Sequence, residues 1–194
     1  MPDSHQEVLL IRHGETEWSR SGQHTSHTDL ALTENGRRMA MLLGAALHDR
    51  HFALVLVSPL RRARDTCRLA GFGDQAQIRP DLMEWEYGDY EGLTTPQIRE
   101  QRPGWSLWTD GCPGGETAEQ VGARADLVIA EARGARGDVA LFAHGHVLRV
   151  LTARWLDLPP EQGRLFALGT GTISALGYER QQPVILRWNQ AVNP

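Results

Sequence analysis

The sequence predicts an α/β fold, a three-layer α/β/α sandwich with a largely parallel central sheet. Three short continuous apolar runs, at 8–11, 52–57 and 139–142, are typical of strands buried on both faces. Helical segments alternate with these runs, and strands that alternate with helices form parallel sheets covered on both sides. No repeat, low-complexity tract or linker interrupts the 194 residues, so we expect a single domain over 1–194.

The elements expected between these strands have local signals of their own. A helix over 33–50 has apolar residues at helical spacing and Thr33 as its N-cap. A short helix over 94–101 begins at Thr94 or Thr95, with Pro96 in its first turn. The stretch 103–115, rich in glycine and proline, is expected to be a loop beside the site. The other expected elements are helices from about 60 to 70, over 116–133 and from 146 to about 156, and β-structure around 172–178 and 183–188.

Composition and charge exclude several classes of protein. The chain has 41% hydrophobic and 23% charged residues and a net charge of −4, which argues against a nucleic-acid partner. No apolar run approaches the roughly 18 residues of a membrane helix, and residues 1–7 lack the pattern of a signal peptide. Two cysteines make no disulfide framework. We therefore expect a cytoplasmic protein with no membrane partner, and the sequence carries no signal of its oligomeric state.

Each of the three apolar runs ends in a polar cluster. Ligands of open α/β sheets bind outside the carboxyl ends of the strands, so neighbouring parallel strands would bring these clusters into one crevice. That crevice would be a local cationic pocket in an acidic protein, suited to a phosphate dianion. The clusters are Arg12-His13-Gly14-Glu15, Ser58-Pro59-Leu60-Arg61-Arg62 and His144-Gly145-His146.

The first cluster offers the chemistry of a nucleophile. Histidine can attack phosphorus and leave again, and we expect the second ring nitrogen of His13 to be fixed by a backbone carbonyl. The arginine fork of Arg12 matches phosphate oxygens, and Gly14 would let the backbone approach the substrate. The alternative is a strand-end histidine beside a surface arginine, which an isolated triplet cannot exclude.

The other two clusters would complete the phosphate pocket. Arg62 stands in the first turn after the second strand, although Arg61 and Arg64 compete for this role. His144 would bind phosphate oxygens as a charged donor, assisted by the backbone N–H of Gly145 at a helix start. A solvated arginine-rich face and a capped strand end are the simpler readings of these two clusters.

An acid is needed to protonate the leaving group. Glu84 lies among aromatic residues in the segment 81–88, a setting suited to that task, but Glu86 and Glu91 are rivals that periodicity cannot separate from it. Trp85, Tyr87, Trp105 and Trp108 either line the pocket or pack in the core.

Metal catalysis is the alternative chemistry. His144 with His146, or His24 with His27 and Asp29, could ligate zinc. The sequence has neither HExxH nor paired CxxC spacing, so we expect no metal and no cofactor.

Five motifs in chain order resemble the histidine phosphatase superfamily, in the branch that includes cofactor-dependent phosphoglycerate mutase. They are Arg12-His13-Gly14-Glu15-Thr16, Leu32-Thr33-Glu34-Asn35-Gly36, Ser58 through Thr66, Glu84 through Gly92, and His144-Gly145. The resemblance implies a phosphoglycerate mutase-like fold, a phosphorylated His13, Glu84 as general acid, and Arg12, Arg62 and His144 around the phosphate. It selects Arg62 and Glu84 over their rivals.

The stretches 84–92, 105–116 and 142–149 carry a finer resemblance, to the subgroup of sedoheptulose-1,7-bisphosphatases and actinobacterial acid phosphatases. It implies metal-independent hydrolysis of small phosphate monoesters, sugar phosphates or broad acid phosphatase substrates, through a phosphohistidine. Beyond the catalytic set, the expected substrate contacts are Gly14, Ser19, Thr25, Tyr87, Gly145 and His146. His146 and Arg149 would meet a second phosphate or serve only the fold.

Two alternatives remain at this stage. Phosphoglycerate mutases carry a lysine beyond the acid glutamate and adjacent arginines after a tryptophan, whereas here the matching stretches, 92–96 and 108–110, supply no basic residue. Ser19 and Thr25-Ser26 also depart from the mutase pattern, which has asparagine and Thr-Gly there. A non-catalytic phosphate-binding module would show a broken nucleophile or acid, and both are intact.

Overall fold

A computed structural model describes residues 6–192 of the chain. Residues 1–5 and 193–194 lie outside the described residues. The expectation that residues 1–7 form no signal peptide therefore concerns residues that lie mostly outside the described part of the chain. Within the described residues, no helix has both the length and the apolarity needed to cross a membrane.

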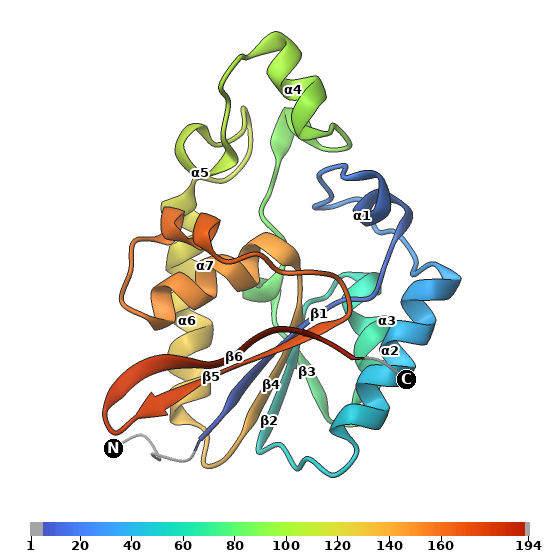
Figure 1. The fold of residues 1–194 in the computed structure, drawn as a ribbon, viewed down its shortest axis with the longest axis vertical. Helices are drawn as coiled ribbons and strands as arrows, with labels where there is room; N and C mark the ends of the chain where they lie inside the picture. Colours follow the sequence, from blue (N-terminus) through green and yellow to red (C-terminus); the bar gives the residue numbers. More distant parts are fainter. Residues whose placement is uncertain (1–5, 193–194) are drawn as a thin grey trace.

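A six-stranded sheet forms the centre of the fold (Figure 1). Its strand order is β3-β2-β4-β1-β5-β6. Pairing is parallel from β3 to β1 and antiparallel from β1 to β6, which makes the sheet mixed. The strands are β1 (Val8–Arg12), β2 (Leu54–Val57), β3 (Ala76–Ile78), β4 (Val139–Ala143), β5 (Thr172–Glu179) and β6 (Gln182–Ala191).

Helices cover both faces of the sheet, which confirms the predicted three-layer α/β/α architecture. On one side, α2 (Glu34–Leu47) and α3 (Arg61–Leu69) pack on alternate strand residues such as Leu9, Val55 and Phe142. On the other, α6 (Ala118–Gly134) and α7 (Gly145–Trp155) pack on the intervening residues, such as Leu10, Leu56 and Leu141. Because successive strand residues point to opposite faces, a strand covered twice is apolar throughout, as the continuous runs indicated.

Threonine caps begin several of the helices. Thr33 accepts from the Gly36 N–H at the start of α2, and Thr94 and Thr117 form capping boxes with Gln97 and Gln120. Of the two cap candidates for α4 (Thr95–Gln101), Thr94 is the cap, and Pro96 lies in the first turn. Short helices complete the set: α1 (Glu17–Ser21), α5 (Leu107–Asp110), and the 3-10 helices Gly73–Gln75, Pro80–Leu82, Gly88–Tyr90 and Pro160–Leu165.

Several predicted boundaries were wrong. The helix expected over 33–50 ends at Leu47, the strand expected from 52 begins at Leu54, and the helix expected from 116 begins at Ala118, after its threonine cap. The stretch 103–115 holds the four-residue helix α5 rather than loop alone. Helix α1 and edge strand β3 have no counterpart among the expected elements, because five and three residues are too few to show a period.

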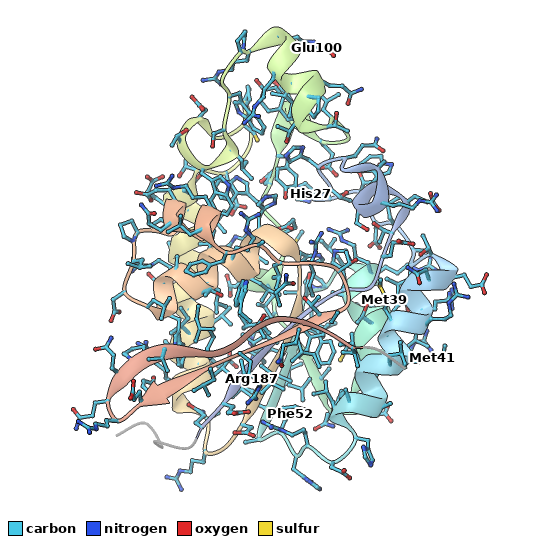
Figure 2. The ribbon with its side chains drawn as sticks, in the orientation of Figure 1. His27, Met39, Met41, Phe52, Glu100 and Arg187 are labelled. Carbon is cyan, nitrogen blue, oxygen red and sulfur yellow. The ribbon has the colours of Figure 1, made fainter. Side chains whose placement is uncertain are left out.

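The three predicted strands are neighbours, as expected, in the order β2-β4-β1. Since all three are parallel, their carboxyl ends meet at one edge of the sheet. Above this edge in Figure 1 lie α1, α4 and α5, with the chain that joins them. His27, labelled in Figure 2, also lies above the sheet. The fold therefore brings the three polar clusters together under a cover of short helices.

Candidate active site

One pocket, of about 220 Å³, opens at the carboxyl edge of the sheet beside β1 and α7. All of the site residues expected from the sequence line it except Gly14, Arg62 and His144. Arg62 and His144 are almost completely buried behind its wall. The lining consists of Arg12, His13, Trp18, Ser19, Gly22, Gln23, His24, Thr25, Glu84, Tyr87, Thr95, Gly145, His146, Arg149 and Leu168.

His13 follows the last residue of β1 and is held by its backbone, whose N–H donates to the Ala143 carbonyl (3.0 Å). Its Nδ1 lies 2.7 Å from the carbonyl oxygen of Gly14. A carbonyl only accepts, so Nδ1 carries the hydrogen and Nε2 keeps its lone pair. Burial, and then the charges of Arg12 and Arg62, hold the pKa of His13 well below its usual value. The ring is therefore neutral, with one basic nitrogen, which is the state a nucleophile needs.

Two guanidinium groups lie beside His13, and neither forms an ion pair with a carboxylate of residues 6–192. Arg12 donates to the Leu168 carbonyl, and its buried Nε has no partner among residues 6–192. Arg62 donates to the carbonyls of Thr25, Ser26 and Thr28 and, through Nε, to His144 Nδ1 (3.1 Å). All of these acceptors are neutral. Burial lowers the pKa of both arginines, and the nearby charge of Glu84 offsets this effect only in part. Buried positive charges are costly when unpaired, so an anion bound beside these two arginines would be stabilised.

His144 lies against His13, with 5.2 Å between the ring centroids. Because its Nδ1 accepts from Arg62, its Nε2 carries the hydrogen and donates to Ser58 Oγ (2.7 Å). Burial, followed by the Arg62 charge, lowers the pKa of His144 well below its usual value. His144 is neutral here with both nitrogens occupied, so a contact with phosphate requires one of these hydrogen bonds to be exchanged. Ser58, at the end of β2, was not expected to have this role.

Glu84 enters the pocket from the segment between β3 and α4. Its carboxylate accepts three backbone N–H groups: Trp85 (2.9 Å) and Val147 (2.9 Å) on Oε1, and His146 (3.0 Å) on Oε2. Two of these donors belong to the first turn of α7. The acid candidate is thus tied to the helix that follows His144.

The other candidates for the roles of Arg62 and Glu84 make contacts outside the pocket. Arg61 and Arg64 are exposed, and Arg61 pairs with Asp65. Glu86 lies on the surface, with its carboxylate 3.2 Å from His27 Nε2. Glu91 accepts the N–H groups of Ser26 and Thr28, and so fixes the loop whose carbonyls receive Arg62.

The two expected glycine contacts have structural reasons as well. A Cβ on Gly14 would collide with the backbone of Gly36 in α2, so its missing side chain serves packing against that helix. A Cβ on Gly145 would lie 3.2 Å from the Arg12 guanidinium carbon. Gly145 therefore lets Arg12 lie flat against the start of α7.

The distal part of the pocket is aromatic and also carries the guanidinium of Arg149. Tyr87 Oη lies 2.6 Å from His146 Nδ1, and the rings of His24 and His146 are parallel at 6.3 Å. Burial lowers the pKa of both histidines, most strongly that of His146. Arg149 lies over the Trp108 ring at 4.6 Å. Trp85 and Trp105 pack in the core instead of lining the pocket. Sequence reasoning missed Trp18 and Thr95, which lie in the short helices α1 and α4, and Gln23 and Leu168, which lie in irregular segments.

The zinc alternatives do not converge. His24 Nδ1 is bound to the Leu93 carbonyl, His27 pairs with Glu86, and Asp29 accepts the Arg61 N–H. Over residues 6–192, no three His, Cys, Asp or Glu side chains gather as metal ligands.

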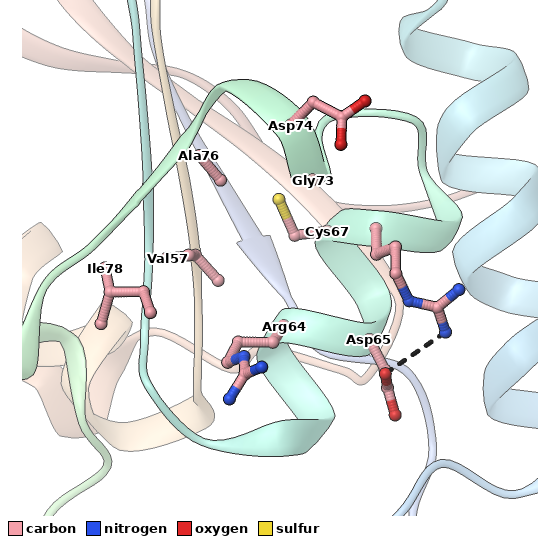
Figure 3. Close-up of a pocket in the computed structure, with 9 residues that line it drawn as sticks. Val57, Arg64, Asp65, Cys67, Gly73, Asp74, Ala76 and Ile78 are labelled. Atoms are coloured by element: carbon pink, nitrogen blue, oxygen red, sulfur yellow. Dashed lines mark hydrogen bonds and ion pairs between the residues drawn. The ribbon is translucent and has the colours of Figure 1, made fainter.

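A second pocket, of about 290 Å³, lies beneath the edge strand β3, away from His13 (Figure 3). It contains Cys67, Arg64 and Asp74, with Ile78 at the rim. Burial raises the pKa of the Cys67 thiol to about 12, so this cysteine is no nucleophile near neutral pH. The chemistry therefore belongs to the pocket at the carboxyl edge.

A neutral histidine between two buried arginines that form no ion pair within residues 6–192, at the carboxyl edge of an α/β sheet, is the kind of site that enzymes acting on phosphate groups use. Similarity to known proteins identifies the family. The family model of the histidine phosphatase superfamily (branch 1) matches residues 8–191. The chain belongs to this superfamily and is a phosphatase.

Individual relatives agree with this assignment. An acid phosphatase of Mycobacterium tuberculosis is 46% identical over 176 residues, covering 89% of this chain and 86% of that protein. Sedoheptulose 1,7-bisphosphatase of Saccharomyces cerevisiae is 38% identical over 191 residues, covering 81% of this chain and 70% of that protein. The solved structure of an open reading frame product from Mycobacterium tuberculosis has a TM-score of 0.91 and 42% identity, covering 97% of this chain and 100% of that one.

Proposed function

We propose that this phosphatase hydrolyses small phosphate monoesters through a phosphohistidine on His13, without a metal ion. One observation carries the proposal. His13 donates through Nδ1 to the Gly14 carbonyl and is kept neutral by burial between two cations, which leaves Nε2 as a nucleophile beside the place where an anion is stabilised. Arg12 and Arg62 supply the positive charge that phosphoryl transfer requires.

The cycle has two displacements at phosphorus. In the first, His13 Nε2 bonds to phosphorus, the ester P–O bond breaks, and protonated Glu84 gives its proton to the leaving alkoxide. In the second, water attacks the phosphorus of the phosphohistidine, Glu84 takes a proton from that water, the P–N bond to His13 breaks, and inorganic phosphate is released. Arg12 and Arg62 hold the phosphate oxygens throughout. His144 joins them when it exchanges its bond to Ser58 or Arg62.

The pocket, of about 220 Å³, has room for a small phosphate ester. Sugar phosphates and general acid phosphatase substrates are the candidates, as the names of the relatives suggest. We assign Ser19, Thr25, Tyr87 and His146 to the substrate beyond its phosphate, with Gly14 and Gly145 shaping the backbone around it. Cys67 and Cys112 are both free thiols, which supports the expectation of a reducing, cytoplasmic location.

The test is steady-state phosphate release in EDTA from a panel: sedoheptulose 1,7-bisphosphate, fructose 1,6-bisphosphate, 3-phosphoglycerate and p-nitrophenyl phosphate. We expect release that survives chelation and falls by at least about 10⁴-fold in His13→Ala. The matched control is His48→Ala, an exposed histidine at the end of α2 whose loss should leave turnover unchanged. Labelled phosphate should remain on the wild-type protein after an alkaline denaturing quench. Turnover in His13→Ala, or loss of activity in EDTA, would overturn the proposal.

A further inference from the structure

The segment that carries Glu84 has little regular structure to hold it. Residues 81–86 run from the end of a one-turn 3-10 helix, Pro80–Leu82, into an irregular stretch. A proton donor must nevertheless be placed closely, since a displacement of about 1 Å can cost about 100-fold in rate. Something outside the segment has to fix its backbone.

Arg124, on α6, binds the carbonyl oxygens along this segment. Its Nη1 donates to Asp81 (2.8 Å) and Met83 (2.6 Å), and its Nη2 donates to Glu84 itself (3.2 Å). The remaining donors form a fork on the Glu116 carboxylate, at 2.8 Å from Nε and 2.9 Å from Nη2. One largely buried guanidinium thus binds three carbonyls and one carboxylate.

Glu116 binds the opposite set of backbone groups. Its carboxylate accepts the Glu86 N–H (2.9 Å), and its own N–H donates to the Glu86 carbonyl (2.9 Å). Its carbonyl accepts the indole N–H of Trp85 (2.9 Å). Together Arg124 and Glu116 engage both sides of Glu84 in the chain.

The side chain of Glu84 is held by a different helix from its backbone. The carboxylate is bound to the first turn of α7, so the residue is fixed at its backbone by α6 and at its oxygens by α7. Helices α6 and α7 pack on each other along one face of the sheet. A shift of residues 81–86 would therefore move the carboxylate relative to α7 and to the phosphate.

We propose that the Arg124–Glu116 pair is a positioning device for Glu84, acting on proton delivery to the leaving group and not on phosphate binding. The inference rests on the proposed function, in which Glu84 is the general acid. A merely structural ion pair would lower the activity toward every substrate alike. A positioning pair affects the substrates that need the proton.

The experiment compares two substrates of one enzyme. p-Nitrophenolate leaves without help, whereas the alkoxide of 2-glycerol phosphate requires a proton. We expect Arg124→Lys, which keeps the charge and loses the fork, to reduce kcat by about 30- to 100-fold on 2-glycerol phosphate and less than about threefold on p-nitrophenyl phosphate. Glu116→Gln is the second variant, and it should show the same selectivity to a smaller degree.

A double-mutant cycle with Glu84→Gln isolates the coupling. If Arg124 acts through Glu84, adding Arg124→Lys to Glu84→Gln should cost less than about twofold further on 2-glycerol phosphate. Arg154→Lys is the matched control, because Arg154 forms an equally forked pair with Asp126 between α6 and α7 (2.9 and 3.1 Å) without contacting residues 81–86. It should be neutral on both substrates.

The outcomes separate the two proposals. Equal losses on both substrates in Glu84→Gln would remove Glu84 as the acid, and with it the proposed mechanism. Selective loss in Glu84→Gln, together with equal losses or none in both Arg124→Lys and Glu116→Gln, would keep the acid and overturn the positioning role. Additive losses in the double variant would overturn it too.

Discussion

The two ends of the central sheet use arginine in opposite ways. At the amino end, Arg50 lies between Glu7 (2.6 Å) and Asp138 (2.7 Å), and Glu7 also receives Arg187 (2.7 Å), the residue labelled low on the sheet in Figure 2. At the carboxyl end, Arg12 and Arg62 find only neutral acceptors among the described residues. The arginines at the amino end are paired with carboxylates of the protein, whereas the two at the carboxyl end are hydrogen-bonded to neutral groups.

The difference distinguishes a stabilising cluster from a binding one. Partly exposed ion pairs contribute modestly to stability and leave nothing for a ligand. Buried cations without counter-charges cost stability in the free protein, and an arriving anion recovers that cost. A buried arginine therefore indicates a binding site only where no carboxylate of the protein pairs with it. Four predictions test this contrast, from the largest effect to the smallest.

Arg12→Met should affect activity most. Removing one of the two cations should lower kcat/KM by about 1000-fold, or about 4 kcal/mol of transition-state stabilisation. Thermal unfolding should show unchanged or increased stability, because the variant removes a charge with no carboxylate partner. Kinetics on p-nitrophenyl phosphate and a melting curve measure both quantities. A stability loss that accounts for the lost activity would contradict the contrast.

Inorganic phosphate should stabilise the protein through the carboxyl end alone. At 100 times its Kd, a ligand specific for the folded state adds about 2.7 kcal/mol to the free energy of unfolding. We expect a phosphate-dependent rise in Tm that is lost in Arg12→Met and retained in Arg50→Met. Sodium chloride at matched ionic strength is the control. Equal stabilisation of all three proteins would place the phosphate elsewhere.

Acid should destabilise the two ends in different pH ranges. Burial lowers the pKa of His13, His24, His144 and His146, so the unfolded chain binds more protons than the folded one below about pH 6.5. Stability should therefore fall as the pH drops below that value, by about 1.4 kcal/mol per pH unit for each proton taken up. A flat profile between pH 7 and 5.5 in urea unfolding would argue that these rings are not neutral through burial.

The amino end should respond only at lower pH. Burial acts to raise the pKa of Glu7, but hydrogen bonds from Arg187 and Arg50 outweigh it, and the net shift is downward from 4.5. Its contribution is present above about pH 4.5 and is lost as the pH falls through the lowered value. Arg50→Met should reduce this acid-sensitive part and leave the histidine part unchanged.

Arg50→Met should have the smallest effect. Its partners are partly exposed, and the loss should be about 1 kcal/mol in the free energy of unfolding. Activity at 25 °C should match that of the wild type, because no contact of Arg50 reaches the pocket. A loss of turnover in a folded variant would show that the two ends are coupled.

The parts of the fold that sequence predicts well are those with a local signal. The runs at 8–11 and 139–142 are apolar throughout, since both faces of β1 and β4 are covered. Thr33 and Thr94 stand at the caps because a side-chain oxygen there satisfies a free backbone N–H. β3 carries no such signal, because it is an edge strand of three residues with two of them exposed.

The site residues also differ in whether a local sequence signal reveals them. Arg12, His13 and His144 could be placed because each stands at the carboxyl end of a recognisable strand. Trp18, Gln23 and Thr95 reach the pocket only through contacts between distant segments, such as the bridge between Gln23 and Thr94 and the hydrogen bond from His24 N to Leu93 O (2.9 Å). The ligands of Arg124 are backbone carbonyls some forty positions away, a pattern that no spacing rule describes.

Gly36 limits how this enzyme can be engineered. Glycine is about 1 kcal/mol worse than alanine inside a helix, so a stabilising redesign of α2 would replace it. A Cβ at position 36 would collide with the backbone of Glu15, two residues beyond His13, just as one on Gly14 would collide with Gly36. The gain in helix propensity would therefore be offset by strain at the turn that positions His13. A redesign that stabilises α2 should keep glycine at position 36, because a side chain there would disturb both the fold and the active site.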